Sequence, residues 1–460
     1  MTSTVLRNPA TQAVIEEIPC AMPADADHAV TIARQAFDDR RWRAASVRTR
    51  REVLRGIADL VKRDHERLAH LESINTGKPI GSARAEMGAV AATFDYYSGA
   101  VDKFGGQTIP GNAPGTLLTF REPIGVCVAI VPWNFPLVIT SWKVAPALAM
   151  GNSVIVKPAE LTPLTALALR DLAIEAGLPA GVLQIVTGKG SEIGTVLATH
   201  PLVSKISFTG STQVGASVMR EAAAGVKRVS LELGGKSANL VFADADLDVA
   251  IESSFWSTYD NAGQDCCSRS RMLVERAVFD EVLERFVARA EATIVGDPSD
   301  EATEIGPLIT PTHRETVEGY LRIGEQEGAS RVCGGDRLDS PGNFLTPAVY
   351  VDVTPDMRIA REEVFGPVVS VLPFEGDDEA IRLANDSIYG LSGSIWCRDI
   401  GRALRVTRAV ETGMLSINSS SSAHIEAPFG GVKQSGLGRE QGMVALEHYS
   451  ELKTVFIAES

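Results

Sequence analysis

The segment KISFTGSTQVG, residues 205–215, indicates the fold more clearly than any other part of the chain. Its first residues predict a short buried strand, and after Gly210 the pattern changes to that of a helix. Glycine at such a turn lets the backbone approach a phosphate, and the helix N-terminus favours negative charge. Because a complete G-x-G-x-x-G is missing, a tight turn without any ligand explains the segment equally well.

The same alternation of strands and helices extends outward from this segment. Further short apolar runs occupy Gly125–Val131, Ser153–Val156, Val182–Val186 and Ala238–Phe242, and a helix is predicted over Thr162–Ala176. Beyond residue 266 the pattern resumes with helices over Ala277–Ile294 and from Thr312, and apolar runs at Val368–Leu372 and Leu415–Ile417. This order predicts βαβ units and a doubly wound parallel sheet, so the fold class is α/β.

Both ends of the chain depart from this alternation. The N-terminal part is predicted to be helical, since apolar residues recur at helical spacing between Val53 and Val61, and Asn75–Pro79 reads as a helix stop. The tail Glu451–Ile457 alternates apolar and polar residues, which predicts a strand paired with another element.

Composition excludes several classes of function. The 460 residues carry a net charge of −14, which disfavours nucleic acid or an anionic membrane as partners. No apolar run approaches the roughly 20 residues of a membrane helix, and no signal peptide is evident. The six cysteines form no zinc pattern, so we expect no metal, free thiols and a cytoplasmic location.

Three groups of residues could carry chemistry. Lys157 and Glu160 follow a strand, where they could reach a ligand, although a solvated charged loop is the commoner case. Glu232 lies between leucines, so it could have a raised pKa and act as a base, or simply end a strand. Cys266 and Cys267 follow a glycine-containing turn, where a nucleophilic thiol or two inert buried ones are both possible.

Taken together, these motifs resemble the aldehyde dehydrogenase superfamily, from about residue 7 to the C-terminus. The motifs occur in the order and spacing of that family: Pro132–Pro136, Lys157–Glu160, Phe208–Gly215, Glu232–Lys236, Gly263–Cys266, Glu362–Pro367 and Ser435–Glu440. The resemblance implies NAD(P)-dependent oxidation of an aldehyde to a carboxylic acid through a thiohemiacetal and a thioester.

The resemblance also implies a role for individual residues. Cys266 matches the nucleophile, Glu232 the base that activates water, and Asn134 the side chain of the oxyanion hole. The residues that match the binding site for NAD, with NADP as an alternative, are Trp133, Lys157, Glu160, Gly190, Gly194, Gly210, Ser211, Val214, Gly215, Leu233, Glu363 and Phe365.

Substrate identity is less determined. Phe135, Trp142 and Phe429 match aromatic walls of the aldehyde tunnel, and Asp260 stands where relatives often place an aromatic residue. An aspartate there favours a polar or amino aldehyde, but it could equally bond a neighbouring backbone N–H. The stretch Ala427–Glu440 also resembles succinate-semialdehyde dehydrogenases, whose substrate is an anion.

Two other interpretations are weaker. A CoA-acylating relative would lack the glutamate matched by Glu232, and an inactive structural homologue would have lost Cys266, Glu232 or Asn134.

The resemblance implies three structural parts. A Rossmann-like cofactor domain is expected over residues 1–104 and 124–234, and an α/β catalytic domain over 235–446. A small β oligomerisation element is expected over 105–123 and 447–460, giving a homodimer or homotetramer.

Overall fold

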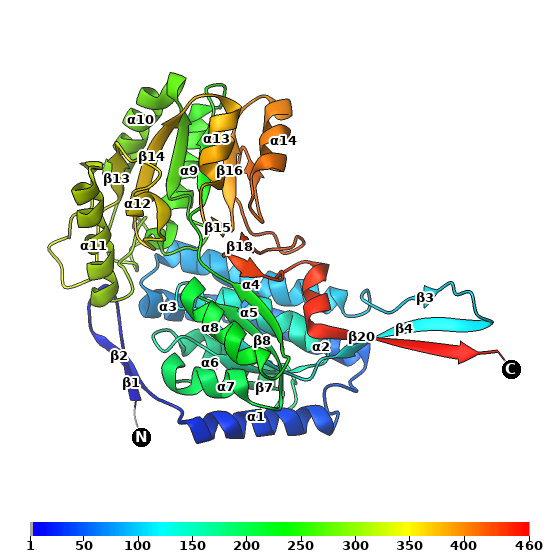
Figure 1. Ribbon diagram of the computed structural model, residues 1–460. Coiled ribbons are helices and arrows are strands. Elements are labelled where there is room, and N and C mark those ends of the chain that lie inside the picture. The colour runs from blue at the N-terminus through cyan, green and yellow to red at the C-terminus, as the bar shows by residue number, and fades with distance from the viewer. Residues whose placement is uncertain (1–2, 460) are drawn as a thin grey trace.

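Residues 3–459 are described by a computed structural model, in which two sheets dominate the molecule (Figure 1). The first sheet has the strand order β19-β9-β8-β5-β6-β7. Its strands are β5 (Val126–Ile130), β6 (Ser153–Lys157), β7 (Leu183–Ile185), β8 (Val203–Thr209), β9 (Arg228–Glu232) and β19 (Gly436–Leu437). All pairs are parallel except β19 with β9. The expected parallel sheet is therefore confirmed, with one strand added from near the C-terminus.

Both faces of the first sheet are covered, as its apolar strands require. Cys127 and Ala129 of β5 pack into one core cluster, and Val126 and Val128 pack into another. The first cluster joins α2 (Val47–Arg63), α4 (Ile80–Ala100), α5 (Pro136–Ala149) and α6 (Leu164–Glu175). The second joins α1 (Pro23–Asp38), α7 (Thr195–Thr199) and α8 (Thr212–Ala223).

The second sheet follows the order β12-β13-β14-β11-β10-β16-β17. Its strands are β10 (Ala238–Val241), β11 (Arg271–Glu275), β12 (Ser330–Cys333), β13 (Ala348–Val351), β14 (Val368–Phe374), β16 (Gly393–Trp396) and β17 (Ser416–Ile417). The associated helices are α9 (Leu247–Tyr259), α10 (Phe279–Glu291), α11 (Pro311–Glu327), α12 (Arg358–Arg361), α13 (Gly376–Asn385) and α14 (Ile400–Ala409). A separate core cluster joins this sheet to its helices.

A third, small sheet leaves the body of the molecule. It consists of β3 (Thr108–Ile109), β4 (Gly115–Pro123) and β20 (Ser450–Ala458), and β4 and β20 are antiparallel along their whole length. Figure 1 shows these two strands extending side by side away from both large sheets. Phe120, Leu452, Phe456 and Ile457 are exposed there. The tail is thus a paired strand, as predicted.

The N-terminal region differs from the prediction in one respect. Ahead of the predicted helices the chain forms an antiparallel pair, β1 (Ser3–Arg7) and β2 (Val14–Pro19). The helix stop is confirmed, because α3 (His65–Thr76) ends just before Gly77. The expected domain limits at residues 1 and 460 lie outside the described residues. Within residues 3–459, no helix is both long and apolar enough to cross a membrane.

Candidate active site

A cavity of about 600 Å³, here called the central pocket, collects residues from the carboxyl ends of four parallel strands. The segments after β5, β6, β8 and β9 all contribute to its lining, which is where α/β sheets bind ligands. The sequence-predicted residues that line it are Trp133, Asn134, Phe135, Lys157, Glu160, Gly190, Gly210, Ser211, Val214, Glu232, Leu233, Cys266, Glu363 and Phe365.

The remaining predicted residues are Gly194, Gly215, Trp142, Asp260 and Phe429, and they do not line this cavity. Trp142 and Phe429 are buried and pack together, with ring centroids 4.8 Å apart. Gly215 packs against Leu233, where a side chain would collide. Gly215 therefore supports the pocket wall from behind Leu233.

The two adjacent cysteines have different surroundings. Cys266 lines the central pocket, whereas Cys267 is buried in the first core cluster. The Cys267 backbone N–H donates to Asp265 Oδ1 at 2.9 Å, which fixes the turn. Contact with the Cys267 thiol, and burial, raise the pKa of the Cys266 thiol. A reaction at Cys266 therefore needs a base to remove its proton.

Glu232 is a buried carboxylate without partners. It is 4% exposed, and neither side-chain oxygen has a hydrogen bond to any of the described residues. Gly430 leaves room for it, since a Cβ there would lie 2.6 Å from Glu232 Oε1. Burial and the nearby Glu440 carboxylate raise the pKa of Glu232, while Lys143 opposes them. A proton acceptor with a raised pKa in a cavity is a typical general base.

Asn134 is held by the loop that carries the cysteines. Its side-chain Nδ2 donates to the Gln264 carbonyl at 2.8 Å, and its own carbonyl accepts from Asn261 Nδ2 at 3.1 Å. An amide nitrogen has two N–H groups, and within residues 3–459 only one of them has an acceptor, so the other can donate into the pocket that Asn134 shares with Cys266. Such a donor can stabilise the oxyanion that forms when the Cys266 sulfur attacks a carbonyl carbon.

The other part of the pocket suits a nucleotide. Burial lowers the pKa of Lys157, against the attraction of Glu160. Glu160 Oε2 is buried with no hydrogen-bond partner in the described chain, so it can accept from ribose hydroxyls. Ser211 caps the N-terminus of α8, accepting from the Val214 N–H at 3.4 Å, and this helix end favours a phosphate. These residues fit NAD.

An aromatic group closes the pocket at the turn before β14. Phe365 has φ +58°, a left-handed conformation that is strained for its type, and its ring meets Trp133 edge-on at 5.3 Å. His313 Nε2 bonds the Phe365 carbonyl at 2.7 Å. Glu363 accepts the Gly235 N–H at 3.0 Å, and burial raises its pKa to about 7. His313 was not predicted, because its link to Phe365 is not visible in the sequence.

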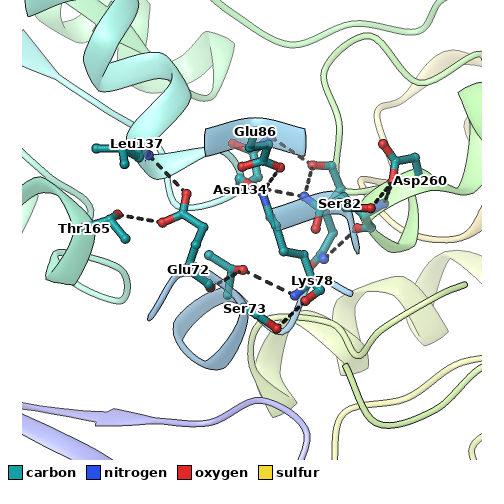
Figure 2. A network of polar contacts seen from close by, with 12 residues as sticks. Glu72, Ser73, Lys78, Ser82, Glu86, Asn134, Leu137, Thr165 and Asp260 are labelled. Carbon is teal, nitrogen blue, oxygen red and sulfur yellow. Dashed lines mark hydrogen bonds and ion pairs between the residues drawn. The ribbon is translucent and has the colours of Figure 1, made fainter. Parts of the chain in front are cut away.

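A buried charge network that the sequence also did not reveal lies beside Asn134 (Figure 2). The Lys78 side chain is fully buried, pairs with Glu86, and lies 4.3 Å from the centre of the Phe135 ring. Glu72 accepts the Leu137 N–H at 3.2 Å at the start of α5. From the sequence, Lys78 is predicted only as part of a helix stop.

Asp260 belongs to this network. Its Oδ1 accepts the Asn261 backbone N–H at 2.9 Å and lies 3.5 Å from Ser82 Oγ (Figure 2). Burial raises the pKa of Asp260, and Lys78 lowers it. The local backbone bond that was the alternative explanation for this aspartate is therefore present.

One close set of potential metal ligands occurs within residues 3–459. It consists of Asp265, Cys266 and Cys267, whose ligand atoms lie within 4.8 Å of one another. All three belong to the cysteine turn itself, and the absence of a metal stays a prediction.

Comparisons with known proteins agree with this geometry. A model of the "Aldehyde dehydrogenase family" matches residues 2–455. Betaine aldehyde dehydrogenase of Bacillus subtilis is 44% identical over 98% of this chain and 93% of its own length. Human retinal dehydrogenase 2 is 46% identical over 98% and 88%. A crystal structure of Staphylococcus aureus betaine aldehyde dehydrogenase with NAD+ has a TM-score of 0.97 at 40% identity, over 99% and 91%.

Proposed function

The chain belongs to the aldehyde dehydrogenase family and is an NAD-dependent oxidoreductase that acts on aldehydes, and we propose that Cys266, Asn134 and Glu232 carry out its reaction. One observation carries this assignment: all three line the same cavity, whereas Cys267 is buried in the core. The neighbouring residues Lys157, Glu160 and Ser211 would hold NAD.

The steps follow from the surroundings of each residue. Cys266 loses its proton to a base in the pocket, and the sulfur attacks the aldehyde carbon, forming a C–S bond. Asn134 donates a hydrogen bond to the resulting oxyanion. When bound, NAD supplies the acceptor for the hydride that leaves the adduct carbon, and the oxyanion then becomes the carbonyl of a thioester on Cys266. Glu232 then takes a proton from water, which attacks the thioester and releases the acid and the Cys266 thiol.

Hydrolysis by water distinguishes this proposal from a CoA-acylating reaction. The Glu232 carboxylate is buried and has no hydrogen-bond partner among the described residues, which supports its role as the base that activates water. The presence of Cys266, Asn134 and Glu232 together also argues against an inactive structural homologue.

The two cysteines provide the test. Cys266→Ala should abolish NADH formation from aldehyde and NAD, and Cys267→Ala, the matched control at the adjacent thiol, should keep most of it. Loss of activity only in Cys267→Ala would overturn the assignment.

For the substrate, we propose a polar aldehyde with a cationic end. Three carboxylates, Glu72, Glu86 and Asp260, surround a single Lys78, and Glu86 Oε2 has no hydrogen-bond partner among residues 3–459. An ammonium group near Phe135 would be attracted by these carboxyl groups and would lower their raised pKa, whereas an anion such as succinate semialdehyde would be repelled by them. The names of the relatives do not decide the question, since they include both betaine aldehyde and retinal dehydrogenases.

Kinetics with four aldehydes would decide it: betaine aldehyde, 4-aminobutyraldehyde, succinate semialdehyde and a simple alkyl aldehyde. We expect the highest kcat/KM for a cationic aldehyde, reduced in Asp260→Asn. A preference for succinate semialdehyde, or an Asp260→Asn variant with unchanged kcat/KM for cations, would contradict the proposal.

We further propose the domain division stated above and assembly through the β4–β20 arm. The exposed Phe120, Leu452, Phe456 and Ile457 on this arm support burial against another copy of the chain. The molar mass in solution, measured by light scattering, would distinguish a monomer from a dimer or tetramer.

For the location we propose the cytoplasm, which the six free thiols support.

A further inference from the structure

Three successive residues just before Cys266 have left-handed backbone conformations. Asn261 has φ 52° and ψ 33°, Ala262 has φ 56° and ψ 34°, and Gly263 has φ 69°. L-residues disfavour this conformation, and consecutive examples are unusual. Such strain persists only where the surrounding structure holds it in place, and it is often found at functional sites.

Gly263 shows why the turn cannot relax. A Cβ at this position would lie 2.2 Å from the Gly366 carbonyl oxygen, so the two backbones are in direct contact. The turn that carries Cys266 is therefore pressed against the turn that carries Glu363 and Phe365.

The side chain of Asn261 holds the turn on its other side. Its Nδ2 donates to the Asn134 carbonyl at 3.1 Å and to the Gln264 carbonyl at 3.3 Å. The Asn134 side chain donates to the same Gln264 carbonyl at 2.8 Å. In return, the Gln264 backbone and side-chain nitrogens donate to the Asn261 carbonyl at 3.1 and 2.9 Å. One buried amide thus links the Asn134 loop to the Cys266 turn.

We propose that Asn261 is a positioning residue that fixes the Asn134 amide relative to the Cys266 sulfur. The inference rests on the proposed roles of Asn134 and Cys266. Because Asn261 is 4% exposed and its Nδ2 has two acceptors, both amide N–H groups are used inside the protein. Without the Asn261 amide, the Asn134 backbone carbonyl loses its hydrogen-bond donor. The Asn134 side-chain N–H is then no longer held in the position from which it stabilises the oxyanion.

Asparagine could also be present only because it tolerates left-handed geometry. Glycine tolerates that geometry at least as well but has no amide to donate. Asn261→Gly therefore keeps the backbone conformation and removes the clamp. Ala262→Gly is the matched control, since it introduces the same glycine one residue later and retains Asn261.

The measurement is the rate of NADH formation in the first turnover, with the NAD dissociation constant and the melting temperature recorded for every variant. We expect Asn261→Gly to slow the first turnover by about 10- to 100-fold, as small misplacements in active sites do. NAD affinity should stay unchanged, and Ala262→Gly should keep the wild-type rate. Asn261→Asp, which has the same size and tolerates the same backbone, replaces Asn261→Gly if the latter does not fold.

A double variant separates this inference from the proposed function. If Asn261 acts through Asn134, adding Asn261→Gly to Asn134→Ala should slow the reaction no further. A first-turnover rate within twofold of wild type in Asn261→Gly, while Asn134→Ala is slow, would overturn the inference alone. A normal rate in Asn134→Ala would instead overturn the oxyanion role on which it rests.

Discussion

Replacing Glu86 with Gln should stabilise the protein, and the gain should grow with pH. Burial raises the pKa of Glu86 from its ordinary value of 4.5 to about 8, although Lys78 pulls it down. Glu72 and Asp260 contribute to the increase. The change to Gln removes one negative charge and keeps an oxygen that can accept from the Lys78 ammonium.

The sign follows from the direction of the shift. An acid whose pKa is higher in the folded state binds its proton more tightly there, so this side chain does not reduce stability below pH 4.5. As pH rises, each unit lowers the free energy of unfolding by about 1.4 kcal/mol until the folded pKa is passed. The loss amounts to about 3 kcal/mol at pH 7 and nearly 5 kcal/mol above pH 8.

Urea unfolding of wild type and Glu86→Gln at about pH 5, 7 and 9 would measure this difference. The two proteins should nearly coincide at the lowest pH and diverge upward. Glu447→Gln, the same change at an exposed position, should follow the wild type throughout. A constant difference between wild type and Glu86→Gln at all pH values, or a destabilised variant at pH 9, would refute the reasoning.

Three further outcomes test the site. Glu232→Gln should retain a burst of NADH while kcat falls by about 10²- to 10⁴-fold, since only hydrolysis of the thioester needs this base; a lost burst would assign it to activation of the thiol. NAD should be preferred over NADP, and Glu160→Gln should reduce the ratio of kcat/KM for NAD to kcat/KM for NADP; an unchanged ratio would show that Glu160 does not discriminate between the two cofactors. Because the pKa of Cys266 is raised, its alkylation by iodoacetamide should accelerate as pH rises; a rate independent of pH would indicate a thiolate already formed.

Sequence periodicity was sufficient for most strands of the first sheet. Strands with apolar residues on both faces, such as Val126–Ile130 and Ser153–Lys157, identify themselves by short apolar runs bounded by turns. Their order then fixes which loops meet at the carboxyl edge, so Lys157 and Glu232 were placed at strand ends from sequence. The strands β1 and β2 were missed because they are largely exposed and lack such runs.

The buried charges could not be predicted in the same way. Lys78 follows a helix-ending glycine, where a lysine is normally solvated, and nothing local indicates that its side chain is fully buried. Glu86 lies nearly two turns into α4, and its partner is set by how α4 packs against the preceding turn. Charge pairing between a loop and the helix that follows it depends on tertiary packing, which the hydrophobic periodicity of a sequence does not reveal.

The conformation of the nucleophile loop shows the same limit at the site itself. Motif spacing identifies Cys266, but its direction depends on three left-handed residues that end at Gly263. Glycine and asparagine are both common in left-handed geometry, but nothing in the sequence indicates it at Ala262, because alanine ordinarily favours a right-handed helix. The loop adopts this shape because Gly366 presses on one side and Asn261 bonds Asn134 on the other. Reactivity at Cys266 therefore depends on Asn134, 132 residues earlier, and on Gly366, 100 residues later, as much as on its own motif.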